Sequence, residues 1–276
     1  MPDAKRSLGQ NFLVDRDLIK KILEKAGFGQ EDQVVELGVG LGHLTRELAR
    51  QVKRVIGIEI DQSLIDWIIE NAPLPQNVEL RKADMLEIDL SMLSKQMGGP
   101  VKLIGNLPYN IASQLLFRLF SQSEYISVGV FMFQKEVADR IMATPGTKRY
   151  GILSVLCSYY FHVERLMDIS PGAFRPRPKV YSTVLRLSPR EPEVAAIDQR
   201  FFKNLVKAAF QMRRKKLVNT LKPLVKSNKK ILEAAFFEIG IYGDMRPEQL
   251  APVDFVRLSN KLLFHLTDRK MVDKSR

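Results

Sequence analysis

The chain has 276 residues, which is enough for two domains that each bury a core of their own. Its 45% hydrophobic and 27% charged residues are typical of a globular protein, and no apolar run approaches the ~20 residues that a membrane helix needs. The N-terminus lacks the uninterrupted apolar core of a signal peptide. A single cysteine excludes an intrachain disulfide framework, and three scattered histidines lack the spacing of a metal site. We therefore expect a cytoplasmic protein without a bound metal.

The net charge of +12 is unevenly distributed along the chain. Residues 1–189 carry a net charge of +3, whereas residues 190–276 carry +9. Within residues 200–232 there are eleven Lys and Arg residues and no Asp or Glu. A solvated lysine face is the ordinary alternative for such a run. A stretch of this length without a carboxylate nevertheless favours a polyanionic partner, with nucleic acid ahead of an acidic membrane surface.

Strands and helices are predicted to alternate over the first two-thirds of the chain. The predicted strands are 33–37, 54–58, 78–82, 101–104, 127–133 and 182–187. The predicted helices between them are 41–51, 62–71, 112–121 and 135–143. This alternation indicates an α/β domain with a mostly parallel sheet, helices on both faces, and a ligand beyond the carboxyl ends of the strands.

After residues 188–190 (SPR) the pattern becomes helical. In FFKNLVKAAF (201–210) apolar residues recur at helical spacing, with Lys203 and Lys207 on the opposite face. Further helical segments are predicted near 229–240, 246–250 and 254–266. We therefore expect a catalytic domain over 1–190 and a small, basic, all-helical domain over 191–276.

A glycine-rich loop, VVELGVGLGHLT (34–45), lies where the first of these strands turns into a helix. Gly38, Gly40 and Gly42 permit a tight turn and let a ligand approach the backbone closely. The spacing G-x-G-x-G differs from the G-x-G-x-x-G of dinucleotide-binding proteins, which favours S-adenosylmethionine over NAD. The loop alone leaves both cofactors open.

Two acidic residues follow the next two strands and narrow the choice. Glu59 is placed to accept hydrogen bonds from both hydroxyls of a ribose, and Asp84 to receive the exocyclic amine of an adenine. Each could instead be a helix cap or a surface carboxylate. Because both carboxylates and the glycine loop occupy one end of a parallel sheet, a cofactor that contains adenosine is the better interpretation.

The stretch KLIGNLPYNI (102–111) places polar groups at the end of the fourth strand. An ordinary strand-to-helix loop is the alternative, but Pro108 makes this turn stiff. The Asn106 side-chain oxygen and the Leu107 carbonyl could hold the hydrogens of an adenine amine, whose delocalised lone pair makes it a poor nucleophile. Tyr109 could stack on the base, a contact worth ~1–3 kcal/mol. These groups predict methyl transfer by positioning and hydrogen bonding, without an initial general base.

Over residues 5–270 the chain resembles the KsgA family of small-subunit ribosomal RNA adenine dimethyltransferases. The motifs that carry the resemblance occur in the family's order: SLGQNFLVD, ELGVGLGHLT, IGNLPYNIAS, FQKEVADRI, YGILSVLCSYYF and GAFRPRPKVYSTVLRL. The resemblance implies a Rossmann-like class I S-adenosylmethionine-dependent methyltransferase domain followed by the helical domain.

The resemblance also implies roles for individual residues. The implied cofactor-binding residues are Asn11, Leu13, Gly38, Gly40, Glu59, Asp84 and Asn106. The implied catalytic residues are Asn106, Leu107, Pro108, Tyr109 and Phe174. Phe174 would stack on the far face of the target base, with loop packing as the alternative for this ring. The expected RNA contacts are Arg175, Arg177, Arg213, Arg214, Lys215 and Lys216.

Four positions depart from the family's usual residues without removing an expected ligand: Val39, His43, Arg177 and Tyr181. Family members make two adjacent N6,N6-dimethyladenosines near the 3′ end of 16S ribosomal RNA in the immature small (30S) subunit. The resemblance therefore implies a ribosome biogenesis enzyme, which we expect to be a monomer.

Three alternatives are weighed against this interpretation. A 23S ribosomal RNA methyltransferase of the antibiotic-resistance type shares the pocket motifs, but NLPYNIAS and RPRPKV fit the small-subunit family better. A non-catalytic RNA-binding assembly factor would not need Glu59, Asp84 and Asn106 intact. A nicotinamide oxidoreductase would leave the NLPY turn and the basic helical domain unexplained.

Overall fold

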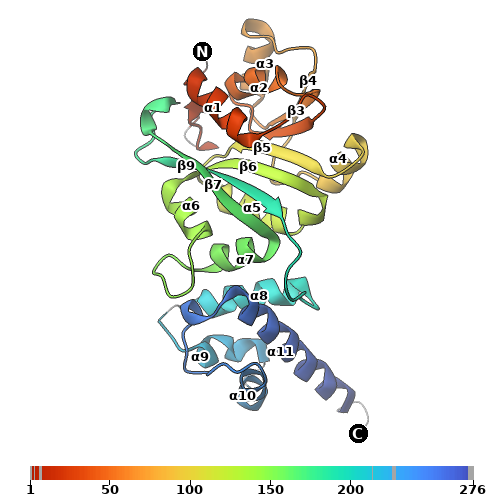
Figure 1. Ribbon diagram of the computed structural model, residues 1–276, viewed down its shortest axis with the longest axis vertical. Coiled ribbons are helices and arrows are strands. Elements are labelled where there is room, and N and C mark those ends of the chain that lie inside the picture. The colour runs from red at the N-terminus through yellow and green to blue at the C-terminus, as the bar shows by residue number, and fades with distance from the viewer. Residues whose placement is uncertain (1, 3, 6–7, 213, 226–227, 273–276) are drawn as a thin grey trace. The chain divides into compact units, whose positions relative to one another are not determined.

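The computed structural model describes residues 2, 4–5, 8–212, 214–225 and 228–272, with the side chains of 268–272 excepted (Figure 1). Its contacts divide the chain into two compact units. The first comprises Met1–Ala138 and Phe161–Pro189, and the second comprises Asp139–Tyr160 and Arg190–Arg276.

The first unit is built on a seven-stranded sheet with the order β4-β3-β2-β5-β6-β9-β7. The strands are β2 (Gln33–Leu37), β3 (Arg54–Glu59), β4 (Val78–Lys82), β5 (Val101–Asn106), β6 (Ile126–Gln134), β7 (Phe161–Ile169) and β9 (Ser182–Pro189). From β4 to β6 neighbouring strands are parallel, whereas β9 pairs antiparallel with both β6 and β7. All six predicted strands are therefore confirmed, and β7 is an additional one.

The helices of this unit connect the parallel strands. They are α1 (Arg16–Ala26), α2 (His43–Ala49), α3 (Gln62–Asn71), α4 (Leu90–Met97) and α5 (Ala112–Phe120), with the 3-10 helices η2 (Ser123–Tyr125) and η3 (Pro171–Ala173) in later loops. Helix α6 (Lys135–Ile141) carries the chain from the first unit into the second. The predicted α/β architecture with a mostly parallel sheet is confirmed.

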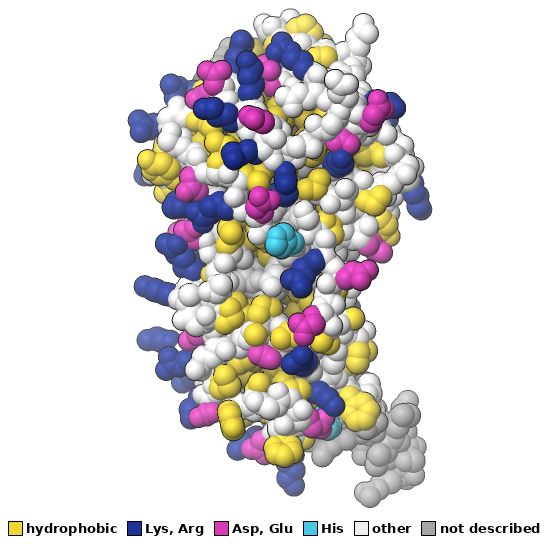
Figure 2. All heavy atoms as spheres, viewed as in Figure 1, with side chains coloured by type: hydrophobic (Ala, Val, Ile, Leu, Met, Phe, Trp, Pro, Cys, Tyr) yellow, Lys and Arg dark blue, Asp and Glu magenta, His cyan; other side chains and the backbone are white. Residues whose placement is uncertain are grey.

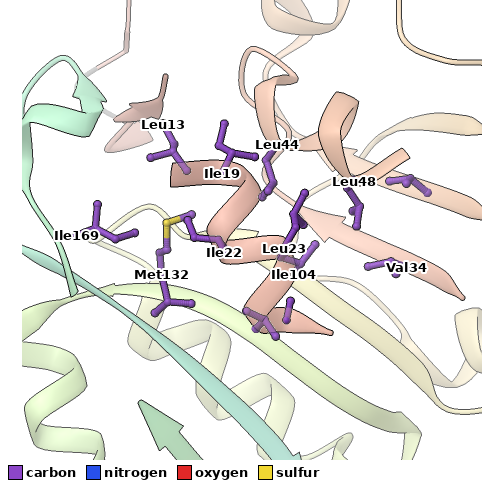
Figure 3. Packing of buried hydrophobic residues seen from close by; sticks show 14 of the residues in the cluster. Leu13, Ile19, Ile22, Leu23, Val34, Leu44, Leu48, Ile104, Met132 and Ile169 are labelled. Carbon is purple, nitrogen blue, oxygen red and sulfur yellow. The ribbon is translucent and has the colours of Figure 1, made fainter. Parts of the chain in front are cut away.

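A hydrophobic core lies between α1 and the sheet (Figure 3). Ile19, Ile22 and Leu23 of α1 are at most 1% exposed and belong to one cluster with Ile104 of β5 and Met132 of β6. Helix α1 begins at an Asp15 cap, whose side chain accepts from the Leu18 N–H. The cap and the apolar face of α1 together fix where the preceding residues enter the first unit.

The residues before α1 are held by a second, two-stranded sheet. Strand β1 (Phe12–Leu13) pairs antiparallel with β8 (Phe174–Arg175), so that Leu13 lies opposite Phe174. The Val14 N–H also donates to the Ala173 carbonyl at 2.9 Å. The N-terminal segment is thereby fixed to the loop before β9.

The second unit is helical. It contains α7 (Ile152–Tyr160), α8 (Gln199–Phe210), α9 (Leu217–Leu221), α10 (Lys229–Glu238) and α11 (Pro252–Val272), with the 3-10 helices η4 (Lys222–Val225) and η5 (Pro247–Gln249). In α8, Phe202, Leu205, Val206, Ala209 and Phe210 are buried, as the periodicity predicted. The segment predicted as a helix at 246–250 forms only the short 3-10 helix η5.

Residues 139–160 belong with the second unit, which differs from the expectation that residues 1–190 form one continuous domain. The buried Tyr150 explains the difference, because its hydroxyl donates to the Leu250 carbonyl at 2.9 Å and its ring packs on Phe210. The chain changes units again between Pro189 and Arg190, where the composition predicted a boundary.

Two further features of the described residues bear on function. None of their helices is both long and apolar enough to cross a membrane. Nor do they contain a group of three or more His, Cys, Asp or Glu side chains that could hold a metal ion.

Candidate cofactor and active site

A cavity of about 250 Å³ lies at the carboxyl ends of the central parallel strands. Its lining includes Gly38 after β2, Glu59 at the end of β3, Asp84 after β4 and Asn106 at the end of β5. The other wall is formed by residues 8–12 of the N-terminal segment. Five of the seven expected cofactor-binding residues therefore line one cavity, whereas Gly40 and Leu13 are not among its lining residues.

The glycine loop turns sharply beside this cavity. Gly38, Gly40 and Gly42 have φ values of 83°, 58° and 72°, in the left-handed region that residues with a side chain rarely adopt. A Cβ atom on Gly40 would lie 3.0 Å from the ring of Phe12, and one on Gly38 would lie 3.2 Å from the Met85 methyl group. Both positions thus need glycine for conformation and for space.

Glu59 joins the glycine loop to the end of β3. Its Oε2 accepts from the Gly40 N–H at 2.8 Å, and its Oε1 accepts from the N–H groups of Ile60 and Asp61 at 3.0 Å. Burial raises the pKa of Glu59, and these backbone hydrogen bonds oppose the shift. These bonds use both lone pairs of Oε1 and one of Oε2, so Oε2 could still accept from a ribose hydroxyl.

Asp84 has one oxygen occupied and one available. Its Oδ1 accepts from the Leu86 N–H at 2.8 Å, while Oδ2 has no hydrogen-bond partner among the described residues. Since Asp84 lines the cavity, Oδ2 is a suitable acceptor for an exocyclic amine.

The orientation of the Asn106 amide is set by the N-terminal segment. Its Nδ2 donates to the Asn11 carbonyl at 2.7 Å. A carbonyl only accepts, so the amide nitrogen faces Asn11 and Oδ1 points away from it. No described residue donates to Oδ1 or to the Leu107 carbonyl, so both acceptors can receive the hydrogens of an amine.

The rest of the NLPY turn is rigid. The Pro108 carbonyl accepts from the N–H groups of Ile111 and Ala112, both at 3.2 Å, at the start of α5. The Tyr109 hydroxyl lies 2.6 Å from the Ser182 Oγ, and burial raises the pKa of Tyr109. Leu107 and Pro108 line the cavity. Tyr109, which its hydroxyl holds beside β9, is not among the residues that line the cavity.

The expectations for Leu13 and Phe174 need correction. Leu13 is 5% exposed and Phe174 is fully buried, and both belong to the core cluster beneath α1. The two residues are directly opposite in the β1–β8 pair, and opposite residues project to the same face of a sheet. In this structure neither side chain lines the cavity, and the alternative of loop packing describes Phe174.

The predicted RNA contacts are exposed where the structure describes them. Arg175 in β8 and Arg177 in the segment after it are exposed, although the Arg175 guanidinium also donates to the carbonyls of Gly172 and Phe174. In the second unit Arg214, Lys215 and Lys216 are exposed, and Arg213 lies outside the described residues. Figure 2 shows exposed Lys and Arg side chains on the face in view of each unit.

Sequence reasoning missed a polar cluster next to the cavity. The Asp61 carboxylate accepts from the Lys5 Nζ at 2.7 Å and from the Gln10 Nε2 at 3.1 Å. Burial opposes ionisation of Asp61, but hydrogen bonds from Lys5, Ser63 and Gln10 lower its pKa to about 2. The available signal was the pattern Asp-x-Ser at 61–63, two residues after Glu59, which is typical of a helix cap. The pattern does not reveal the contacts with the N-terminal segment.

Comparisons with known sequences identify the family of the chain. The family model described as "Ribosomal RNA adenine dimethylase" matches residues 1–263. A "Ribosomal RNA small subunit methyltransferase A" of Francisella tularensis subsp. tularensis is 41% identical over 94% of this chain and 97% of its own length. The protein of the same name in subspecies novicida is 40% identical over the same shares.

Solved structures show the same fold. A dimethyladenosine transferase from Plasmodium falciparum matches with a TM-score of 0.71 and 24% identity, covering 94% of this chain and 98% of that one. The 23S ribosomal RNA methyltransferase ErmE matches with a TM-score of 0.63 and 28% identity, covering 91% and 99%. The predicted Rossmann-like class I methyltransferase fold with a helical C-terminal region is confirmed.

Proposed function

The chain belongs to the ribosomal RNA adenine dimethylase family of S-adenosylmethionine-dependent methyltransferases, and we propose that its substrate is the small ribosomal subunit. The product would be two adjacent N6,N6-dimethyladenosines near the 3′ end of 16S ribosomal RNA. The observation that carries the proposed chemistry, methyl transfer to an adenine amine, is the Asn106 amide, which the Asn11 carbonyl orients so that Oδ1 remains available beside the Leu107 carbonyl.

The cavity residues fit S-adenosylmethionine. The loop from Gly38 to Gly42 offers the close backbone approach that the methionine part needs, Glu59 would hold the ribose hydroxyls, and Asp84 Oδ2 would accept from the adenine amine. When bound, this cofactor supplies a methyl group on a positively charged sulfur. The protein's own contribution is to hold the target amine in line with that methyl group and to exclude water.

The target amine is held by acceptors rather than deprotonated at the start. Hydrogen bonds to Asn106 Oδ1 and the Leu107 carbonyl would draw its hydrogens out of the ring plane and localise the nitrogen lone pair. After transfer the amine nitrogen carries a positive charge, which the same two oxygens stabilise until a proton is released to water. Tyr109 is the proposed stacking residue, since the base must leave its own stack to enter the site.

The choice of the small subunit is supported by relatives that are 41% and 40% identical over nearly their whole length. The excess of positive charge in residues 190–276 is suited to phosphate contacts. The proposed contacts there are Arg213, Arg214, Lys215 and Lys216. Arg175 and Arg177 are the proposed contacts in the first unit. We further propose a monomeric cytoplasmic enzyme that acts during ribosome biogenesis.

Large-subunit RNA is the second candidate substrate, because ErmE shares the fold over 91% of this chain. The deciding experiment supplies labelled S-adenosylmethionine with small subunits that lack the modification, with large subunits and with deproteinised RNA, and locates the label by mass spectrometry. Dimethyladenosine confined to the small-subunit RNA is expected. Label on the large subunit would contradict the proposal, and cofactor binding without transfer to any RNA would indicate a non-catalytic assembly factor.

A further inference from the structure

We propose that Asp61 is a positioning residue that fastens the N-terminal arm over the cofactor cavity. The N-terminal arm is defined as residues 4, 5 and 8–13. Through its contacts with the arm, Asp61 would slow release of the cofactor and maintain the orientation of the Asn106 amide. The inference rests on the proposed function in taking S-adenosylmethionine as the occupant of the cavity.

The N-terminal arm forms one wall of the site. Residues 8–12 line the cavity, and the Asn11 carbonyl holds the amide of Asn106 at 2.7 Å. The arm also packs on α3, because Ala4 and Phe12 belong to an apolar cluster with Leu64 and Trp67. If the arm lifted, the cavity would open on that side and Asn106 would lose the contact that orients it.

Asp61 holds the arm at two places. Its Oδ1 lies 2.7 Å from the Lys5 Nζ and its Oδ2 accepts from the Gln10 Nε2 at 3.1 Å. Lys5 and Gln10 are themselves joined, since the Lys5 N–H donates to the Gln10 Oε1 at 2.8 Å. The Asp61 side chain is 3% exposed and that of Lys5 is 48% exposed, so the anion is buried while its cation reaches solvent.

The same residue is connected to the cofactor loop through its backbone N–H. The Asp61 N–H donates to Glu59 Oε1 at 3.0 Å, and Glu59 Oε2 accepts from the Gly40 N–H at 2.8 Å. The segment 59–61 therefore fixes the glycine loop on one side and the N-terminal arm on the other. The position of the N-terminal arm and the conformation of the glycine loop therefore both depend on residues 59–61.

Asp61 also caps α3, and Asp89 provides a matched control for that structural role. The Asp61 Oδ1 accepts from the Ser63 N–H at 3.1 Å and from the Ser63 Oγ at 2.6 Å. Asp89 caps α4 with the same pattern, accepting from the Ser91 N–H at 2.8 Å and the Ser91 Oγ at 2.6 Å. Asn is a good cap, so Asp61→Asn and Asp89→Asn both keep their caps, and the first also weakens the hold on the arm.

The experiment measures the dissociation rate and affinity of S-adenosylmethionine for the wild type, Asp61→Asn, Lys5→Ala, their combination, and Asp89→Asn. The fluorescence of Trp67, the one tryptophan of the chain, reports the docking of the arm because this ring packs in the same cluster as Phe12. Isothermal titration supplies an independent affinity.

Asp61→Asn and Lys5→Ala are each expected to speed release by about 10-fold, the size of one charge-assisted hydrogen bond. Their combination should speed release little more than Lys5→Ala alone, because both substitutions weaken the contact between Lys5 and Asp61. Lys5→Ala also removes the hydrogen bond from the Lys5 Nζ to the Ser63 Oγ at 3.1 Å. Asp89→Asn should release the cofactor at the wild-type rate. The change in Trp67 fluorescence should follow the faster release.

Equal rates for Asp61→Asn and Asp89→Asn would overturn the proposal, as would fully additive effects of Asp61→Asn and Lys5→Ala. If Asp61→Asn fails to fold, Lys5→Ala alone decides, since that side chain is half exposed. A wild-type protein that binds no S-adenosylmethionine would refute the proposed function itself. If only the role of Asp61 is wrong, the wild type will bind S-adenosylmethionine and the variants will release it at the wild-type rate, so the two failures can be distinguished.

Discussion

Both polar atoms of the Asn106 amide have a role in the proposed site. Nδ2 is bonded to the Asn11 carbonyl, and Oδ1 is the proposed acceptor for the target amine. Asn106→Ala removes both, and Asn106→Asp removes the donor but keeps an acceptor. We expect transfer by Asn106→Ala to fall by ~10²–10³-fold, as for the loss of one preorganised hydrogen-bonding group, while the cofactor affinity changes only a few-fold.

Single-turnover rates and cofactor titrations on the same samples separate these two effects. Asn106→Asp should transfer faster than Asn106→Ala if acceptance by Oδ1 is what matters. Near-wild-type turnover by Asn106→Ala would refute the role of Asn106 outright.

Glu36 lies in β2 under the cofactor loop and is 1% exposed. Burial, with a contribution from the charge of Glu59, raises the pKa of Glu36 from 4.5 to about 8. The folded protein therefore keeps a proton that the unfolded chain releases above pH 4.5, so Glu36 lowers the free energy of unfolding progressively from pH 4.5 to about 8. Glu36→Gln should remove this slope.

The expected gain in stability of Glu36→Gln over the wild type at pH 8.5, relative to pH 4.5, is on the order of a few kcal/mol. Urea denaturation at several pH values measures it, with the exposed Glu70→Gln as the control. Parallel stability curves for the wild type and Glu36→Gln would show that Glu36 is ionised in the folded protein.

For individual residues, the sequence could predict a place in the site where the residue lies at the end of a strand. Gly38, Glu59, Asp84 and Asn106 line one cavity because the carboxyl ends of parallel strands share an edge. Phe174 was not predictable in this way, since its burial depends on a pairing with Leu13 across 161 residues of chain. A two-residue strand pair leaves no periodic pattern in the sequence.

Among the elements, the glycine loop is shaped by its contact with the N-terminal arm. Gly40 has a φ of 58°, and an added Cβ would press on Phe12 at 3.0 Å. Gly98, the C-cap of α4, has a φ of 76° with nothing within 4 Å of an added Cβ. Gly40→Ala and Gly98→Ala should therefore share a loss of stability of about 1 kcal/mol from the left-handed backbone.

Only Gly40→Ala should also weaken cofactor binding, by about 10-fold, because displacing Phe12 disturbs the wall of the cavity. Thermal unfolding together with cofactor titration tests both expectations. If the two variants bind the cofactor equally well, the loop and the arm act independently.

Strands with a strong apolar run were predictable, and so was the edge strand β4, whose VELRK sequence alternates, whereas the edge strand β7 was not. β2, β3 and β5 are mostly buried and read as apolar segments, as expected of parallel strands covered on both faces. β7 lies at the edge of the sheet, and most of its residues are only partly buried or exposed. Its sequence FHVERLMDI lacks the regular alternation by which a half-buried strand is recognised.

At the scale of the whole molecule, most of the excess positive charge lies in the part of the chain that forms the second unit. Residues 190–276 carry a net charge of +9 against +3 for residues 1–189, and all but residues 139–160 of the second unit lie in that basic part. Composition predicted the boundary near residue 190. It could not predict that residues 139–160 would join the second unit, because a buried apolar helix has the same sequence pattern in either unit.

The final prediction tests this charge division. The exposed Arg214, Lys215 and Lys216 of the second unit are compared with Lys20, Lys21 and Lys25, three exposed cations of α1 in the first unit. Changing either set to Ala removes the same charge. If the first set contacts phosphates, its loss should reduce the slope of log affinity for the small subunit against log salt by about 2 to 3, since each contact releases about one counterion.

The α1 variant lowers the same net charge without removing a proposed contact, so it should shift the affinity slightly and leave the slope unchanged. Binding measured between 50 and 200 mM salt, roughly the range over which such contacts are lost, separates the two variants. Equal slopes would mean that the second unit attracts RNA through its overall field, and that the phosphate contacts lie on other residues.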